Sequence, residues 1–156
     1  MSLKIEVGDV FNELLVKHEA GKPVIFMHGC NAQGVMGSGV AALVKKLYPF
    51  AYERYKAVGK KNLKMGEVYL ASDDSTTVSV ANAITQEFYG RDGKAYLDYD
   101  AIINSCQIVA AMARTLNSPV YLPLIGGGLG GGDKKRLIAI FQAVFHDIDA
   151  TLWLQE

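Results

Sequence analysis

Two glycine-rich segments of the chain have the composition of backbone phosphate-binding loops. The first is Gly37-Ser38-Gly39-Val40, and the second runs from Gly126 to Gly132 with six glycines and one leucine. Glycine permits a positive φ and lets an anion approach backbone N–H groups that a Cβ would shield. A simple turn needs only one or two glycines, so this density favours phosphate binding over a merely tight or flexible turn.

Neither segment matches a familiar nucleotide motif. No Lys-Ser or Lys-Thr pair follows either of them, as a Walker A loop requires, and Gly37-Ser38-Gly39 lacks the third glycine of a dinucleotide fingerprint. A kinase and a nicotinamide-dependent dehydrogenase are therefore disfavoured.

Side chains that could perform acid–base chemistry flank these segments. His28 titrates near neutral pH and would suit water activation or protonation of a leaving group, although a histidine at a strand end is often only structural. Asp133 would serve as general base or orient water, or would simply cap the following helix. Cys30, two residues beyond His28, is a minor candidate for a nucleophile.

Hydrophobic periodicity predicts strands that alternate with helices. Such an order favours an α/β fold with a mostly parallel sheet, in which ligands bind beyond the carboxyl ends of the strands. Both glycine-rich segments follow a predicted strand. The expected strands cover residues 3–7, 24–27, 66–71, 77–84, 120–124 and 150–154, and the expected helices cover residues 10–17, 39–47, 98–116 and 134–145, with another beginning at residue 49.

Composition limits the classes of protein that remain. The chain has 156 residues, half of them hydrophobic, which predicts one domain over residues 1–156. Sixteen basic and sixteen acidic residues balance, which argues against binding to RNA or another polynucleotide. Two cysteines, no secretory segment and no apolar stretch of about 20 residues predict a soluble cytoplasmic protein without membrane contact.

Four segments in this order resemble the macro domain family over essentially the whole chain. They are Val7-Gly8-Asp9-Val10, the run from His28 to Gly34, the run from Met36 to Ala41, and the run from Pro123 to Gly132. The chain looks closest to the branch that processes ADP-ribose 1″-phosphate or removes ADP-ribose from macromolecules, which includes stand-alone phage and bacterial members. The resemblance implies a single three-layer α/β/α domain with a mostly parallel mixed sheet.

The resemblance also implies roles for individual residues. Asp9, with Gly8 and Val10 beside it, matches the acidic residue that accepts a hydrogen bond from the adenine amino group, and Asn31 matches the asparagine that contacts the distal ribose. His28 stands where a phosphatase-type branch carries a histidine. The two phosphate loops correspond to Gly37, Ser38, Gly39 and Val40 and to Gly126, Gly127, Gly128, Leu129, Gly130 and Gly131. Asp9 as a helix cap and Asn31 as a turn residue stay open as simpler interpretations.

The chain also departs from the family. The branch that hydrolyses glutamate-linked ADP-ribose carries a lysine and an aspartate where this chain has Gln86 and Gly130, which argues against that mechanism here. Lys134 replaces an aromatic residue of near relatives and would either attract a terminal phosphate or lie in solvent.

Two functions follow from these observations. The first is a hydrolase, independent of metal and cofactor, in which His28 and Asp133 act on ADP-ribose 1″-phosphate or on ADP-ribose attached to a protein or nucleic acid. The second is a module that binds ADP-ribose without turnover. The same loops would serve both, so the sequence leaves the choice open.

Overall fold

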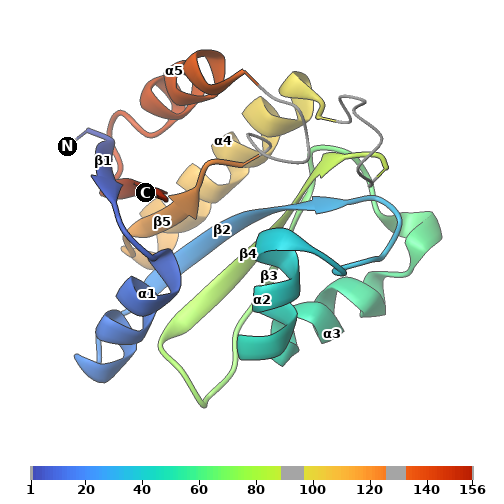
Figure 1. Ribbon diagram of the computed structural model, residues 1–156, viewed down its shortest axis with the longest axis horizontal. Helices are drawn as coiled ribbons and strands as arrows, with labels where there is room; N and C mark the ends of the chain where they lie inside the picture. Colours follow the sequence, from blue (N-terminus) through green and yellow to red (C-terminus); the bar gives the residue numbers. More distant parts are fainter. Residues whose placement is uncertain (1, 89–96, 126–132, 156) are drawn as a thin grey trace.

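The computed structural model describes residues 2–88, 97–125 and 133–155. Its centre is a six-stranded sheet with the strand order β1-β6-β5-β2-β4-β3 (Figure 1). Among the described strands β3 alone runs antiparallel to its neighbour, which confirms the mostly parallel mixed sheet. The strands are β1 (Lys4–Val7), β2 (Val24–Asn31), β3 (Val68–Ala71), β4 (Val78–Gln86), β5 (Val120–Pro123) and β6 (Ala150–Leu154).

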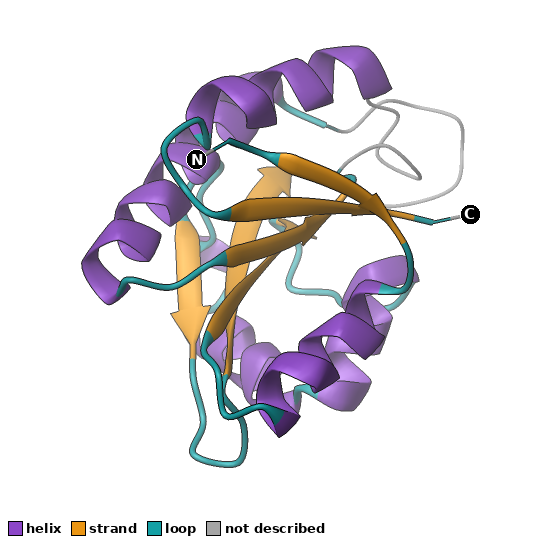
Figure 2. Cartoon of the chain, turned by 90° about the vertical axis from the view of Figure 1, so that its left-hand side faces the viewer, coloured by secondary structure: helices purple, strands orange, loops and turns teal. Residues whose placement is uncertain are grey.

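Helices cover both faces of the sheet (Figure 2). One face packs against the first three helices through a cluster that includes Phe26, Leu14 and Val44, and the other packs against the last two through a cluster that includes Ile25 and Phe141. The helices are α1 (Val10–Glu19), α2 (Gly39–Leu47), α3 (Pro49–Val58), α4 (Tyr99–Leu116) and α5 (Lys134–Val144), with a 3₁₀ turn η1 (Lys60–Asn62). No helix among the described residues is both long and apolar enough to cross a membrane.

Strand β2 is longer than its apolar run predicts. The sequence indicates a strand that ends at Met27, but the ladder with β4 continues through His28, Gly29 and Cys30 to Asn31. The strand can carry polar residues here because β4 offers Asn82 directly opposite His28. Side chains alternate along β2, so His28 lies on the same side as Phe26, beneath the layer formed by α1, α2 and α3.

Candidate functional site

The connections after β2 and β5 leave the sheet in opposite directions. These two strands are parallel neighbours, with Ile25 opposite Val120, yet β2 leads to α2 on one face and β5 leads to α5 on the other. In open α/β sheets such a topological switch point is where ligands bind, beyond the carboxyl ends of the strands. We use the term switch point for the carboxyl ends of β2 and β5 and the segments that follow them.

Helix α2 begins at the switch point without a side-chain cap. Asp9, Asp98 and Asp133 each accept a hydrogen bond from a first-turn N–H of α1, α4 and α5, at 2.9, 3.1 and 3.0 Å. Ser38, at the same position before α2, makes no such bond. The first-turn N–H groups of α2 are therefore open to an anion.

Backbone conformation explains two glycines of the first loop. Gly34 and Gly39 have φ values of 79° and 60°, in the left-handed region that glycine occupies at little cost. Gly37, Ser38 and Gly39 are exposed, as the predicted phosphate loop requires. The second predicted loop, from Gly126 to Gly131, lies outside the described residues.

The side chain of Asn31 uses most of its hydrogen-bonding capacity within the turn that follows it. Its Oδ1 accepts hydrogen bonds from the N–H groups of Gln33 and Val35 at 3.0 and 3.3 Å, and its Nδ2 donates to the Val35 carbonyl at 2.8 Å. The turn interpretation is thus confirmed. One Nδ2 hydrogen remains for a ligand, so Asn31 can act toward a ribose hydroxyl as a donor only.

Tyr55 holds this turn from helix α3. Its hydroxyl lies 2.9 Å from Asn31 Oδ1 and also donates to the Asn31 carbonyl, and it accepts the Gly34 N–H at 3.0 Å. Burial raises the pKa of the Tyr55 phenol well above its usual range, so the hydroxyl stays protonated. Tyr55 therefore fixes the direction in which Asn31 presents its remaining N–H.

The substitution Tyr55→Phe is expected to weaken the ADP-ribose binding that the sequence predicts about tenfold and to lower the free energy of unfolding by about 1–3 kcal/mol, because it leaves buried partners of the hydroxyl unsatisfied. Calorimetry and thermal denaturation measure the two effects. Tyr52→Phe is the matched control, since Tyr52 lies on the same helix and its hydroxyl bonds to none of the described residues. Equal effects from both substitutions would contradict the positioning role.

Asp9 lies beyond the carboxyl end of β1, the edge strand of the sheet, three strand positions away from β2. It caps α1 through Oδ1, as one interpretation of the sequence predicts, while its second carboxylate oxygen has no partner among the described residues. Trp153 lies beneath the neighbouring Gly8, where an added Cβ would approach the indole to 3.3 Å. The indole N–H is buried without a described hydrogen-bond partner.

Asp133 is exposed and is tied to helix α4 through its backbone. Its N–H donates to the Tyr99 hydroxyl at 2.8 Å, and the guanidinium of Arg136 lies 3.7 Å from the centre of the Tyr99 ring. Its side chain caps α5 through Oδ1. The cap function is confirmed, and the other carboxylate oxygen bonds to none of the described residues.

His28 is fully buried in the core. Its Nε2 lies 2.7 Å from Asn82 Oδ1, and the Asn82 amide nitrogen donates to the carbonyls of Ala51 and Tyr69. Asn82 therefore offers His28 an acceptor, which assigns the imidazole proton to Nε2. Burial lowers the pKa of His28 to about 4, and the hydrogen bond to Asn82 offsets only part of that effect. The imidazole is neutral at pH 7 and has no exposed surface, which weighs against its predicted catalytic role.

Cys30 is no better placed for catalysis. Its Sγ lies 3.6 Å from His28 Nε2, so the two side chains share a face as expected. Burial raises the pKa of the Cys30 thiol far above its usual range, which disfavours the nucleophilic thiolate. With Asn82 the two residues form a closed polar cluster inside the core.

Other residues that the sequence singles out lie apart from this chemistry. Gln86 ends β4, and its Nε2 donates to the Phe88 carbonyl at 2.7 Å. Lys134 is exposed at the start of α5. His18 on α1 accepts a hydrogen bond from the Thr77 N–H at 3.3 Å. Among the described residues no three His, Cys, Asp or Glu side chains gather to hold a metal ion.

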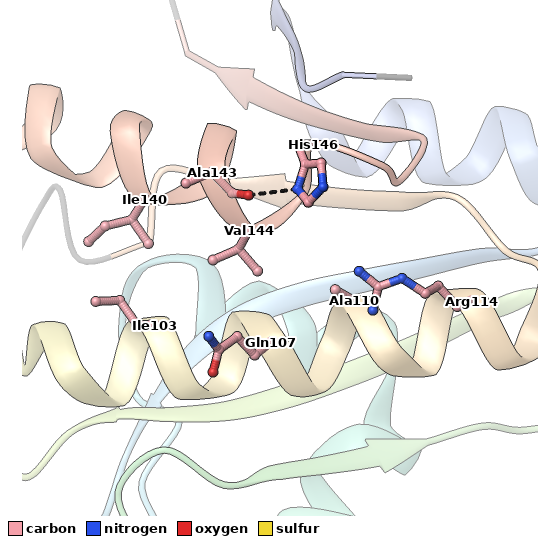
Figure 3. Close-up of a pocket in the computed structure, with 8 residues that line it drawn as sticks. All are labelled: Ile103, Gln107, Ala110, Arg114, Ile140, Ala143, Val144 and His146. Carbon is pink, nitrogen blue, oxygen red and sulfur yellow. Dashed lines mark hydrogen bonds between the residues drawn. The ribbon is translucent and has the colours of Figure 1, made fainter.

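A groove of about 460 Å³ lies between α4 and α5, away from the switch point (Figure 3). Ile103 and Ile140 line it, and its charged groups are already engaged. Arg114 forms a two-fold ion pair with Asp147 at 2.9 and 3.0 Å, and His146 Nδ1 lies 2.9 Å from the Ala143 carbonyl. The guanidinium of Arg114, which lines the groove, is therefore already paired.

Similarity to known proteins agrees with this geometry, although no family model matches the chain. An ADP-ribose 1″-phosphate phosphatase of Candida albicans is 32% identical over 82 residues, which are 52% of this chain and 51% of that protein. A DNA ADP-ribosyl glycohydrolase of Mycobacterium tuberculosis is 29% identical over 132 residues, 79% of this chain and 36% of that protein. These matches span about half or less of the relatives' length.

Solved structures share the fold. A protein of unknown function from Bacteroides thetaiotaomicron superposes with a TM-score of 0.84 at 24% identity, over 99% of this chain and 98% of that one. The macrodomain of Mycobacterium tuberculosis DarG gives 0.79 at 22% identity, over 97% and 96%. Thermosipho africanus DarTG in complex with ADP-ribose gives 0.75 at 20% identity, over 97% and 41%. The fold is that of the macrodomains. Together with the sequence similarity, it supports the resemblance of this chain to the macro domain family.

Proposed function

We propose that the chain, acting as one domain, binds ADP-ribose across the switch point and hydrolyses a bond to the 1″ carbon of the distal ribose. The observation that carries this proposal is the uncapped N-terminus of α2 next to Asn31, since it offers N–H groups to a phosphate between two polar ends. Asp9 follows β1 and Asn31 ends β2, and these two strands are three strand spacings or roughly 14 Å apart in the sheet. Such a span suits an elongated dinucleotide-like ligand.

Each part of the ligand has a proposed partner. The free carboxylate oxygen of Asp9 accepts a hydrogen bond from the adenine amino group, with Gly8 and Val10 beside it. The residues from Gly37 to Val40 and from Gly126 to Gly131 bind the diphosphate through their N–H groups, and Asn31 donates to the distal ribose. The similar proteins support an ADP-ribose ligand, since one is an ADP-ribose 1″-phosphate phosphatase and another is a DNA ADP-ribosyl glycohydrolase.

Asp133 is the proposed general base. Its free carboxylate oxygen takes a proton from the attacking water, the remaining hydroxide oxygen bonds to C1″, and the leaving group departs with the bonding electron pair. His28 is proposed to be structural, because a neutral and fully buried imidazole cannot exchange protons with a bound ligand without leaving the core.

The substitution Asp133→Asn tests the catalytic role separately from the cap. Asparagine caps helices as well as aspartate does, so stability is expected to change by less than about 0.5 kcal/mol. Loss of the carboxylate is expected to slow turnover about 10²–10⁴-fold while ADP-ribose affinity stays within threefold. Phosphate release from ADP-ribose 1″-phosphate measures the first and calorimetry the second. Unchanged turnover would leave Asp133 as a cap only.

A module that binds ADP-ribose without turnover is the second candidate, favoured by the burial of one of the two predicted catalytic residues. The deciding experiment titrates the protein with ADP-ribose and then supplies ADP-ribose 1″-phosphate and an ADP-ribosylated oligonucleotide. Binding with release of either leaving group supports the hydrolase, and binding alone supports the second candidate. Absence of binding contradicts both.

Cys30 and Cys106 are free and buried, which supports a reducing cytoplasmic location.

A further inference from the structure

The zero net charge of the chain conceals a strong segregation of charge. Between residues 39 and 66 the sequence holds seven lysine or arginine residues and a single acidic residue, Glu53, a net charge of +6. All 16 basic and 16 acidic residues balance, so the rest of the chain carries a net charge of −6. Overall neutrality therefore does not exclude local attraction of a polyanion, contrary to the expectation from composition.

Seven exposed cations lie on α2, on α3, on η1 and just beyond η1, and we call this set of residues the basic face. Helices α2 and α3 pack against each other on the same side of the sheet, and η1 directly follows α3 (Figure 1). None of the seven side chains forms an ion pair with any described residue within 4 Å. They are Lys45, Lys46, Arg54, Lys56, Lys60, Lys61 and Lys64, and every one is exposed.

Aromatic rings order part of the basic face. The Nζ atoms of Lys45 on α2 and Lys56 on α3 lie 4.2 and 5.6 Å from the centre of the Tyr52 ring. The Arg54 guanidinium lies 5.5 Å from the centre of the Tyr69 ring. These contacts hold cations from two helices close together, which reduces the entropy lost when an anion binds them.

The favourable interaction of a cation with the C-terminal end of a helix dipole explains the position of only some of these seven residues. Lys45, Lys46 and Lys56 lie in the last turns of their helices, where cations are favourable without any ligand. Arg54 and the lysines at positions 60, 61 and 64 lie outside those turns. Their accumulation without ion pairs to described residues points to an anionic partner.

The basic face is continuous with the switch point. Helix α2 begins at Gly39 of the first glycine-rich loop, and α3 contacts the turn after β2 through Tyr55. A polymer bound along α3 and η1 would thus reach the segment that we propose binds the distal ribose. A broad anionic surface would also approach the acidic residues of the rest of the protein, which would repel it. A narrow polymer can contact the basic face alone.

We propose that the basic face binds the phosphodiester backbone of single-stranded nucleic acid. This inference rests on the proposed function in one respect, because it makes a nucleic acid the carrier of the ADP-ribose that the switch point receives. Binding to the backbone itself requires no ADP-ribose. Lysine and arginine contacts to phosphates release counterions, so the affinity must fall steeply as salt rises.

The test measures fluorescence anisotropy of labelled single-stranded DNA and RNA of about 15 nucleotides, a length within reach of one small domain. The variant Lys60→Glu with Lys61→Glu removes two cations of the basic face. Lys4→Glu with Lys22→Glu is the control, because both residues are exposed, lie outside the face and change the net charge equally, with Lys4 3.9 Å from the exposed carboxylate of Asp149. Thermal denaturation verifies that all three proteins fold.

The wild-type protein is expected to bind with log affinity falling against log salt at a slope of about −2 to −4. The basic-face variant is expected to bind at least about tenfold more weakly with a slope reduced by about two, and the control within threefold of wild type. Absence of binding at low salt, equal loss in both variants, or binding to phosphatidylserine vesicles without oligonucleotide binding would overturn the proposal.

Calorimetry with free ADP-ribose on the same proteins separates the two proposals. The basic-face variant is expected to bind ADP-ribose as wild type does, since neither lysine belongs to the proposed ligand contacts. If the wild-type protein binds the oligonucleotide but not ADP-ribose, the proposed function fails and the nucleic-acid surface stands. If it binds ADP-ribose alone, the basic face has no nucleic-acid role.

Discussion

The substitution His28→Ala is expected to lower the free energy of unfolding by about 3 kcal/mol or more, while the folded fraction still binds ADP-ribose. The substitution opens a cavity in the core and leaves Asn82 Oδ1 without its buried partner. Denaturant unfolding measures the stability, and turnover is normalised to the folded fraction. A stable variant whose turnover falls more than a hundredfold would restore the catalytic role of His28.

The burial of His28 also predicts how the stability of the protein depends on pH. Because the pKa of His28 is lowered from its ordinary value to about 4 in the folded state, the unfolded chain binds more protons between about pH 6.5 and pH 4. Stability is therefore complete above pH 6.5 and falls through that window, by up to about 3 kcal/mol. His28→Gln is expected to flatten this fall. Replacing both His18 and His146 by glutamine is the control, which should leave it in place.

The second large effect is expected from Gly29→Ala. A Cβ at Gly29 would lie 2.7 Å from Thr85 Oγ1 and 2.8 Å from Ile125 Cγ2, closer than real side chains approach. Ile125 directly precedes the second glycine-rich segment, so moving it disturbs the proposed phosphate site. We expect a stability loss of about 2 kcal/mol and at least tenfold weaker ADP-ribose binding.

A matched control separates these two consequences. Val109→Ala removes volume from the core on α4, far along the chain from the switch point, and is expected to cost about as much stability with affinity unchanged. Adding Thr85→Ala to Gly29→Ala removes one of the two clashes and is expected to recover part of both losses. Equal weakening of binding by Gly29→Ala and Val109→Ala would show that affinity follows stability alone.

Local chemistry in the sequence predicts most of the element boundaries. Asp9 and Asp133 mark the starts of α1 and α5 because an aspartate oxygen satisfies a first-turn N–H, and both caps are confirmed. The helix from Gly39 to Leu47 is confirmed with the same bounds. The end of β2 was predicted too early, since a polar run carries no apolar pattern and its strand pairing depends on β4 more than 50 residues away.

The candidate site was predicted less completely for the same reason. Asn31 stands out by its position after a strand, whereas an aromatic residue on a helix, such as Tyr55, indicates only core packing. Tyr55 is buried as expected, but its hydroxyl organises a turn 24 residues away along the chain. Likewise, the burial of His28 beneath α3 follows from side-chain alternation in a strand whose length the sequence understates. Tertiary contacts of this kind leave no local signal.

The two ends of the proposed site differ in how far local opening can reach them. Strand β2 lies between two neighbours and is buried along nearly its whole length, so its backbone amides should exchange with solvent only when much of the domain unfolds. Strand β1 is an edge strand whose four residues are all exposed, and its opening requires the loss of few contacts. Asn31 is therefore supported by the global stability of the fold, while Asp9 follows a strand that can fray independently. The end of the site near β1 can adapt its shape, and the end near β2 is fixed.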